Sequence, residues 1–170
     1  MTGKIILFTG GIRSGKSKHS EQMAMELSPT PKYVATARIL DNEMKKRVAL
    51  HQSRRGDNWI LSEADVDIAS AINDGDVALV DCVTMWITNL FFDYKCNADS
   101  AIQFIEKSLD RITKKDATVI FVTNEIGLGG VNPDPMTRCF TDLHGKVNAM
   151  IAELSQSVYM SISGIKVKIK

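Results

Sequence analysis

Short runs rich in β-branched residues recur along the chain, and longer segments with helical periodicity separate them. The runs cover positions 4–9, 33–36, 77–82 and 119–123, and the first, third and fourth are almost continuously apolar. Runs of this length and composition are typical of buried parallel strands. The intervening segments predict helices over 16–27, 42–53, 64–73, 85–92, 100–114 and 135–156. This alternation predicts an α/β fold, a mostly parallel sheet flanked by helices and built with right-handed crossovers.

The end of the chain follows a different pattern. Val158, Met160 and Ile162 alternate with more polar neighbours, Ser163-Gly164 forms a turn signal, and lysines alternate with apolar residues over 165–170. Strict alternation favours two antiparallel strands. We expect a C-terminal edge hairpin whose last strand keeps a lysine-rich face in water and so blunts the sheet edge.

Composition narrows the functional classes. A chain of 170 residues with 44% hydrophobic positions predicts one α/β domain over 1–170. The formal net charge of +1 provides no general field for nucleic acid, and no apolar stretch approaches the roughly 18 residues of a membrane span. Three widely spaced cysteines argue against a disulfide framework or a zinc site. We therefore expect a cytoplasmic protein with no nucleic-acid partner and no membrane span.

The strongest chemical signal lies between the first predicted strand and the first predicted helix. Positions 10–17 match the pattern G-x-x-x-x-G-K-[ST] of a phosphate-binding loop, or P-loop. In such a loop, backbone N–H groups and the positive end of the helix dipole hold phosphate oxygens. The fold is therefore expected to be P-loop NTPase-like. The predicted nucleotide contacts are Gly10, Gly11, Ile12, Arg13, Ser14, Gly15, Lys16 and Ser17.

A magnesium site is expected beside this loop. Lys16 would reach the outer phosphates, and the Ser17 hydroxyl would be a ligand of Mg²⁺. P-loop enzymes place an acidic residue at the end of a neighbouring buried strand to help hold the metal, and Asp81 ends the run over 77–81. The alternative is that Asp81 only caps the following helix.

The loop alone does not name the reaction, since motors, switches and kinases share it. The chain lacks the Asn-Lys-x-Asp signature with which GTPases read guanine, and it is small for a motor or helicase. A small-molecule kinase remains, and such an enzyme needs an acceptor site beside the γ-phosphate. The polar stretch 123–127 after the fourth predicted strand is a candidate, although a plain strand-to-loop turn is an equal alternative.

One histidine has a suggestive context. Met44, Val48 and His51 would share one helical face, and this spacing alone favours a packed histidine that satisfies a hydrogen bond. Arg55 follows four residues later. A continuing helix would place its guanidinium near the imidazole, where it could hold a phosphate for attack by the ring nitrogen.

Taken together, the motifs resemble one family closely over essentially the whole chain. They are residues 10–17, Ala35-Thr36, 41–44, 51–55, Trp59, Glu63, 81–84, 88–90 and 122–127, followed by Arg138, Phe140, Asp142-Leu143, Gly145, Val147-Asn148 and Ser163-Gly164. The family is the bifunctional adenosylcobinamide kinase/adenosylcobinamide-phosphate guanylyltransferases of cobalamin biosynthesis. No single short motif carries the resemblance.

The resemblance implies two reactions with ATP, GTP and Mg²⁺ as cofactors. The first phosphorylates the aminopropanol hydroxyl of adenosylcobinamide, and the second transfers GMP from GTP onto that phosphate. In the family a histidine is transiently guanylylated, and His51 occupies its position. The imidazole would attack the α-phosphorus and form a phosphoramidate, which the cobinamide phosphate then displaces. The catalytic residues so implied are His51, Lys16 and Arg55.

The resemblance also implies further GTP contacts and an assembly. The contacts are Ala35, Thr36, Ala37, Gln52, Ser53, Arg54, Arg55, Glu63 and Asp81. The Glu63 carboxylate could accept two hydrogen bonds from guanine; without that role it is a favourable first-turn helix residue. Ile12 replaces the alanine usual in the family, so its side chain should point away from the phosphates. Relatives form trimers, so a homotrimer is expected, to which the edge hairpin could contribute.

Two alternatives stay open at this point. The chain could retain only the kinase or only the transferase activity. It could also be a regulatory module that binds a nucleotide, hydrolyses it slowly and signals by changing shape.

Overall fold

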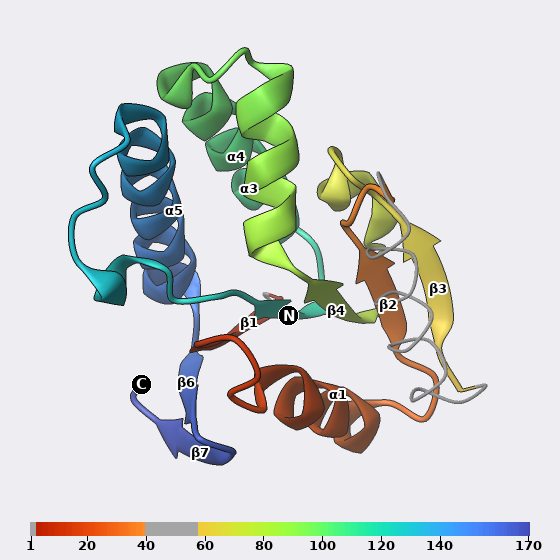
Figure 1. Ribbon diagram of the computed structural model, residues 1–170. Coiled ribbons are helices and arrows are strands. Elements are labelled where there is room, and N and C mark those ends of the chain that lie inside the picture. The colour runs from red at the N-terminus through yellow and green to blue at the C-terminus, as the bar shows by residue number, and fades with distance from the viewer. Residues whose placement is uncertain (1–2, 40–57) are drawn as a thin grey trace.

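The computed structural model describes residues 3–39 and 58–170. Two single turns of 3₁₀ helix, η1 (Ile68–Ala71) and η2 (Gly127–Gly129), accompany the regular elements drawn in Figure 1. The strands are β1 (Lys4–Gly10), β2 (Lys32–Ala35), β3 (Ile60–Glu63), β4 (Val77–Asp81), β5 (Thr118–Val122), β6 (Ser157–Ile162) and β7 (Ile165–Lys168). The helices are α1 (Lys16–Leu27), α3 (Val83–Asp93), α4 (Ala98–Thr113) and α5 (Pro135–Leu154).

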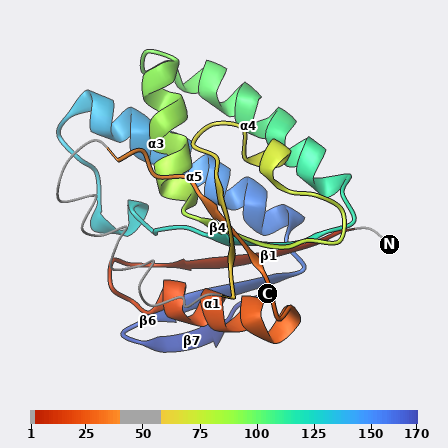
Figure 2. The same cartoon turned by 90° about the vertical axis from the view of Figure 1, so that its right-hand side faces the viewer.

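The seven strands found in the described residues form one sheet in the order β3-β2-β4-β5-β1-β6-β7. Every neighbouring pair is parallel except the antiparallel pair of β6 and β7. Figure 2 shows α3, α4 and α5 on one face of the sheet and α1 on the other. The prediction of a mostly parallel, helix-flanked sheet with a C-terminal antiparallel hairpin is therefore confirmed.

Alternation along β1 explains how one strand contributes to two cores. Ile5 and Leu7 pack with the side chains of α3, α4 and α5, whereas Ile6 and Phe8 pack on the α1 side with Ala24. All are buried, and each large apolar side chain removed from water contributes about 1.5–3 kcal/mol. Burial on both faces is why this segment reads as a continuous apolar run.

The predicted helix over 64–73 is wrong: only the single turn η1 forms there. The side chain of Asp67 caps this turn by accepting from the Ser70 N–H. The carbonyl oxygens of Asp65 and Val66 are bound by the side chains of Asn89 and Trp86 on α3. An α-helix would need those carbonyls for amides four residues on, so tertiary contacts replace the helix.

Strand β3 was not predicted. Its apolar side chains Ile60 and Leu61 are both about half exposed, at 53% and 51%, because β3 forms the outer edge of the sheet. An edge strand without a buried face lacks the apolar run by which buried strands are recognised. The predicted helix over 42–53 lies outside the described residues.

The strand register aligns the carboxyl edge of the sheet. Glu63 pairs with Ala35, Ala35 with Asp81, Asp81 with Val122, and Val122 with Phe8, so these five residues form one row. The expectation that the strand of Asp81 lies next to β1, the strand before the phosphate-binding loop, is wrong. Strand β5 lies between β1 and β4.

The chain leaves β1 and β5 in opposite directions. From β1 it continues into α1 on one face, and from β5 it continues into α5 on the other face (Figure 2). Loops that diverge from adjacent parallel strands open a crevice at their carboxyl ends, where α/β proteins bind ligands. The glycine-rich loop 10–17 lies at this point.

Candidate active site

The start of α1 is built for an anion. Gly15 precedes the helix with φ 96° and, as a glycine, offers the first turn no side-chain cap, and no acidic residue lies in that turn. Lys16 and Lys18 stand there instead. Cations at a helix N-terminus oppose the helix dipole, whereas a bound phosphate would neutralise both the lysines and the dipole.

The loop itself is held closely by the C-terminal hairpin. The Gly164 N–H donates to the Ser14 carbonyl at 2.9 Å, and a β-carbon on Gly10 would lie 2.4 Å from the Ser161 carbonyl oxygen. The Ser14 side chain is buried, and its Oγ has no hydrogen-bond partner among the described residues. Such an orphaned hydroxyl is a ready donor for a phosphate oxygen.

Lys16 folds back over the loop that precedes it. Its Nζ donates to the Gly11 carbonyl at 3.1 Å, and the residue is only 9% exposed. Burial lowers the pKa of the Lys16 ammonium, and the nearby Asp81 carboxylate opposes that shift. An ammonium already desolvated at the loop is pre-positioned for a phosphate. Ile12 is 86% exposed, as expected if its side chain points away from the loop interior.

Asp81 and Ser17 are suited to magnesium. The Tyr33 hydroxyl donates to Asp81 Oδ2 at 2.8 Å, while Oδ1 has no hydrogen bond within the described part of the chain. Both Asp81 and Ser17 are half-buried and therefore reachable. Residues 3–39 and 58–170 contain no group of three or more acidic, histidine or cysteine side chains that could hold a metal. Mg²⁺ commonly takes only one or two protein ligands and fills its shell with water and phosphate oxygens.

Thr36 is an internal anchor. Its hydroxyl donates to the Cys82 carbonyl and accepts from the Cys82 N–H, both at 2.8 Å, and the residue is fully buried. The Thr36 carbonyl accepts from Asn89 Nδ2 at 2.8 Å. The Thr36 side chain is therefore occupied by hydrogen bonds within the protein and is not available to a nucleotide. The neighbouring Ala35 and Ala37 are half-buried and remain the accessible members of the predicted contact 35–37.

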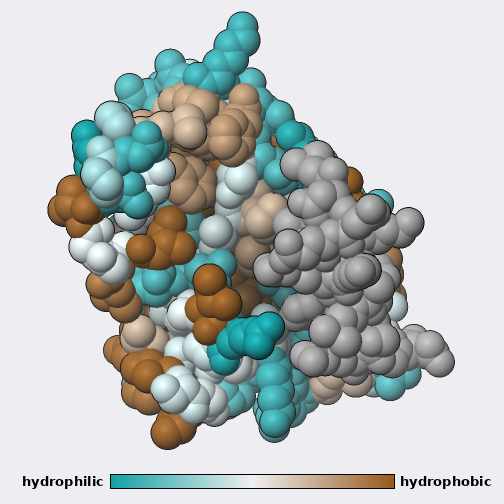
Figure 3. Space-filling model, viewed as in Figure 1, coloured by the Kyte–Doolittle hydropathy of each residue, from teal (hydrophilic) through white to brown (hydrophobic). Residues whose placement is uncertain are grey.

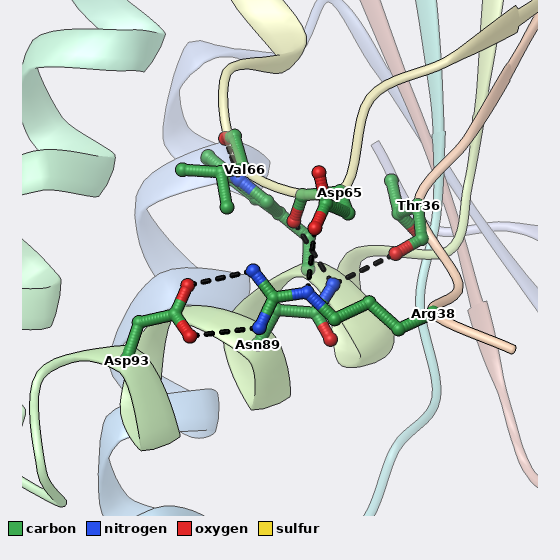
Figure 4. A network of polar contacts seen from close by, with 7 residues as sticks. Thr36, Arg38, Asp65, Val66, Asn89 and Asp93 are labelled. Carbon is green, nitrogen blue, oxygen red and sulfur yellow. Dashed lines mark hydrogen bonds and ion pairs between the residues drawn. The ribbon is translucent and has the colours of Figure 1, made fainter. Parts of the chain in front are cut away.

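Arg38, two residues after Thr36, adds ion pairs to these hydrogen bonds nearer the surface. Figure 4 shows its guanidinium between Asp93, which accepts two hydrogen bonds at 2.7 Å, and Asp65, which accepts one at 2.5 Å. These pairs raise the pKa of Arg38. Asn89 binds the carbonyls of both Thr36 and Asp65, so α3 holds the chain after β2 and the chain after β3 together.

The sequence-predicted site residues fall into three groups. Loop 10–17, Ala35 and Asp81 meet at the central carboxyl edge of the sheet. Glu63 ends β3 rather than starting a helix, and it lies four strands from β1, about 19 Å at the usual strand spacing. His51, Gln52, Ser53, Arg54 and Arg55 lie outside the described residues.

A buried polar cluster behind the turn after β5 was missed from the sequence. His144 is fully buried, and its Nε2 lies 2.9 Å from Thr84 Oγ1. Thr84 Oγ1 accepts from both the backbone N–H and the side-chain amide of Asn124. Its own proton is then directed to Nε2, which places the ring proton on Nδ1, a buried atom without a hydrogen-bond partner among the described residues. Burial lowers the pKa of His144 to about 4, which keeps it neutral.

Other surface features lie away from the loop. A hollow of about 350 Å³ lies between α4 and α5, and a second of about 270 Å³ lies at the amino ends of β1, β4 and β5. In Figure 3, apolar side chains gather at the lower left, over the hairpin of β6 and β7. The exposed apolar residues of that hairpin are Ile162, Ile165, Val167 and Ile169. In this structure neither face of β7 is buried.

The fold and the loop define a P-loop nucleotide-binding protein of the α/β class. Solved structures support the fold: an ATPase from the type III secretion system of pathogenic bacteria has a TM-score of 0.55 at 13% identity, covering 98% of this chain and 58% of its own. A protein from Pyrococcus horikoshii OT3 has a TM-score of 0.53 at 10% identity, covering 99% and 87%.

The chain belongs to the family "cobinamide kinase / cobinamide phosphate guanyltransferase", whose model matches residues 6–169. It is 39% identical to the bifunctional adenosylcobalamin biosynthesis protein CobU of Escherichia coli (strain K12), covering 98% of this chain and 99% of that protein. It is 32% identical to the CobP protein of Pseudomonas aeruginosa, covering 96% of each. The resemblance inferred from the motifs is thus confirmed. Among the described residues, no helix is long and apolar enough to cross a membrane.

Proposed function

We propose that this chain carries out both reactions of its family on one phosphate-binding loop. The chain is a bifunctional enzyme of adenosylcobalamin biosynthesis, a cobinamide kinase and cobinamide phosphate guanylyltransferase. In the first reaction it phosphorylates adenosylcobinamide with ATP or GTP. In the second it transfers GMP from GTP to that phosphate, giving adenosylcobinamide-GDP.

The observation that carries the proposal is the set of unmet anion-binding groups in loop 10–17. The buried Ser14 hydroxyl is unpartnered in the described chain, Gly15 offers the first turn of α1 no side-chain cap, and the desolvated Lys16 ammonium is bonded only to the Gly11 carbonyl among the described residues. Each would be satisfied by a triphosphate. Both reactions develop negative charge on phosphoryl oxygens, and pre-positioned donors of this kind stabilise it.

Magnesium is part of the proposal. Ser17 and Asp81 would hold it, since a hydroxyl and a carboxylate oxygen are ligands that Mg²⁺ accepts. When bound, the metal neutralises phosphate charge. Tyr33 fixes the Asp81 carboxylate so that its second oxygen remains available.

The transferase step is proposed to use His51. Its imidazole nitrogen attacks the α-phosphorus of GTP and pyrophosphate leaves; a phosphate oxygen of adenosylcobinamide phosphate then displaces the imidazole. Arg55 would stabilise the phosphoryl charge, and Gln52, Ser53, Arg54 and Glu63 would bind GTP. The support for these roles is the motif resemblance, together with the position of Ala35 beside both Glu63 and Asp81 in the strand register.

Intact-protein and peptide mass spectrometry after incubation with GTP and magnesium tests the transferase proposal. We expect the mass of one GMP on His51, and its absence in His51→Ala. The matched control is Gln103→Ala, an exposed position on α4 away from the loop, which should keep the adduct. A wild-type protein without adduct, or an adduct that persists in His51→Ala, would contradict the proposed nucleophile.

Turnover separates an enzyme from a regulatory module. We expect nucleoside triphosphate consumption to rise strongly when adenosylcobinamide is added. A slow hydrolysis rate that adenosylcobinamide does not change would favour the module.

We also propose that the protein assembles as a homotrimer in the cytoplasm. The exposed apolar side chains of the hairpin support a contact with a second copy, since such a patch is costly in water. Light scattering coupled to size-exclusion chromatography should give three times the mass of the chain. A monomeric mass at micromolar concentration would contradict the assembly.

A further inference from the structure

The turn after β5 brings an acidic side chain to the base of the phosphate-binding loop. The Glu125 N–H donates to the Gly10 carbonyl at 3.1 Å, and Thr9 Oγ1 donates to Glu125 Oε2 at 3.1 Å. Glu125 is therefore bonded, through main chain and side chain, to the last two residues of β1. Its carboxylate is fixed where the loop begins, at the point where the connections after β1 and β5 diverge.

Helices α3 and α5 make this turn rigid. Asn148 Nδ2 donates to the Asn124 carbonyl at 3.1 Å, and Asn148 Oδ1 accepts from the buried Thr123 hydroxyl at 2.8 Å. The Asn124 side chain is held by Thr84, which in turn is bound to His144. Groups fixed in this way need no reordering when a substrate arrives, which is what catalytic positioning requires.

The acidic side chains at this edge of the sheet differ in their partners. Asp65 and Asp93 bind the Arg38 guanidinium, and Asp81 lies near Lys16 and receives the Tyr33 hydroxyl. Within residues 3–39 and 58–170, Glu125 has no ion-pair partner, and only its Oε2 is hydrogen-bonded. The residue is half-buried, so Oε1 is free to accept a proton from a bound molecule.

We infer that Glu125 is the general base of the phosphorylation step. Its carboxylate accepts the proton of the acceptor hydroxyl while the hydroxyl oxygen forms a bond to the γ-phosphorus. The bond from that phosphorus to the bridging oxygen breaks, and the nucleoside diphosphate leaves with the electron pair. Thr9 holds one carboxylate oxygen and so aims the other. The inference rests on the proposed kinase activity and assigns it a residue.

Two other roles for Glu125 give different experimental results. If Glu125 only held the loop in shape, its loss would weaken nucleotide binding and both reactions. If it held magnesium, its loss would raise the metal concentration that both reactions need. A general base for the acceptor hydroxyl serves the kinase step alone, because a phosphate acceptor has no proton to remove.

The test compares Glu125→Gln with wild type in two separate assays. One measures diphosphate release with adenosylcobinamide, and the other measures pyrophosphate release with previously prepared adenosylcobinamide phosphate and GTP. We expect kcat of the kinase reaction to fall by about 10²–10⁴-fold, the usual contribution of a general base, with KM for both substrates nearly unchanged. The transferase rate should stay within about twofold. Glu125→Asp, which keeps the carboxylate on a shorter stem, should recover part of the kinase rate.

A second variant serves as the control for Glu125→Gln. Glu153→Gln, an exposed position on α5, removes a carboxylate away from the loop and should keep both rates. Kinase activity near wild type in Glu125→Gln would overturn the inference, as would an equal loss in both assays or a loss that added magnesium restores. A wild-type protein that fails to phosphorylate adenosylcobinamide would instead refute the proposed function itself.

Discussion

The buried His144 predicts a specific dependence of stability on pH. Burial alone lowers its pKa from 6.5 to about 4, because no charged partner among the described residues contributes to the shift. The unfolded chain therefore binds a proton at pH 5 while the folded chain does not. A group with a depressed pKa of this kind contributes stability that is complete above about pH 6.5 and is lost as pH falls towards 4.

The magnitude follows from the two pKa values. Between pH 7 and pH 5 the linkage amounts to about 2 kcal/mol of unfolding free energy, and continuing to pH 4 adds about 1 kcal/mol. Other acidic groups also titrate, so the effect must be isolated by difference. His144→Gln removes the titration while its side-chain oxygen can still accept the Thr84 proton.

The assay is urea unfolding of both proteins at pH 7, 6 and 5. We expect wild type to lose about 2 kcal/mol more than His144→Gln over this range, with similar m-values. NMR of the imidazole should show a neutral ring at pH 5. Parallel pH profiles for the two proteins, or a ring that titrates near 6.5, would refute the reasoning.

Three other contrasts can be measured directly. Gly10→Ala should lower the unfolding free energy by about 1–3 kcal/mol, since its β-carbon would collide with the Ser161 carbonyl oxygen. Gly11→Ala should not, because a β-carbon there meets no described atom within 4 Å apart from its chain neighbours; equal losses in urea would contradict this. Lys16→Met should weaken binding of a fluorescent GTP analogue about 10- to 150-fold through loss of a charged hydrogen bond, and an unchanged Kd would count against the loop assignment. Asn89→Ala should cost about 2 kcal/mol because it leaves the carbonyls of Thr36 and Asp65 unpaired, while the exposed pair broken in Asp93→Asn should cost less than about 1 kcal/mol; the reverse order would show that the surface pair matters more.

What the sequence predicted well was locally encoded. Helical periodicity after the loop motif located α1 at Lys16–Leu27, and short runs rich in β-branched residues located β1, β2, β4 and β5. What it missed depended on partners distant in the chain. Strand β3 has exposed apolar residues, and the segment after it loses its carbonyls to Asn89 and Trp86, which no local pattern reveals.

The same distinction holds for the site. The loop and Asp81 follow from motif and strand order, although the insertion of β5 beside β1 was not expected. His144 reads in sequence as one polar residue on a mostly apolar helix face. Only the fold brings it to Thr84 and Asn124, so its effect on the turn before Glu125 could not be predicted.

The loop of residues 10–17 depends on the hairpin that ends this sheet. The Gly164 amide binds the Ser14 carbonyl, and His19 meets Ser161, a residue 142 positions later. During synthesis, the nucleotide-binding loop leaves the ribosome long before the hairpin that contacts it. Contacts between residues so far apart in the chain form slowly. A nascent chain is therefore expected to bind GTP poorly until the hairpin of β6 and β7 has left the ribosome. We expect a tag fused beside the hairpin to lower the affinity for the nucleotide before it disturbs folding.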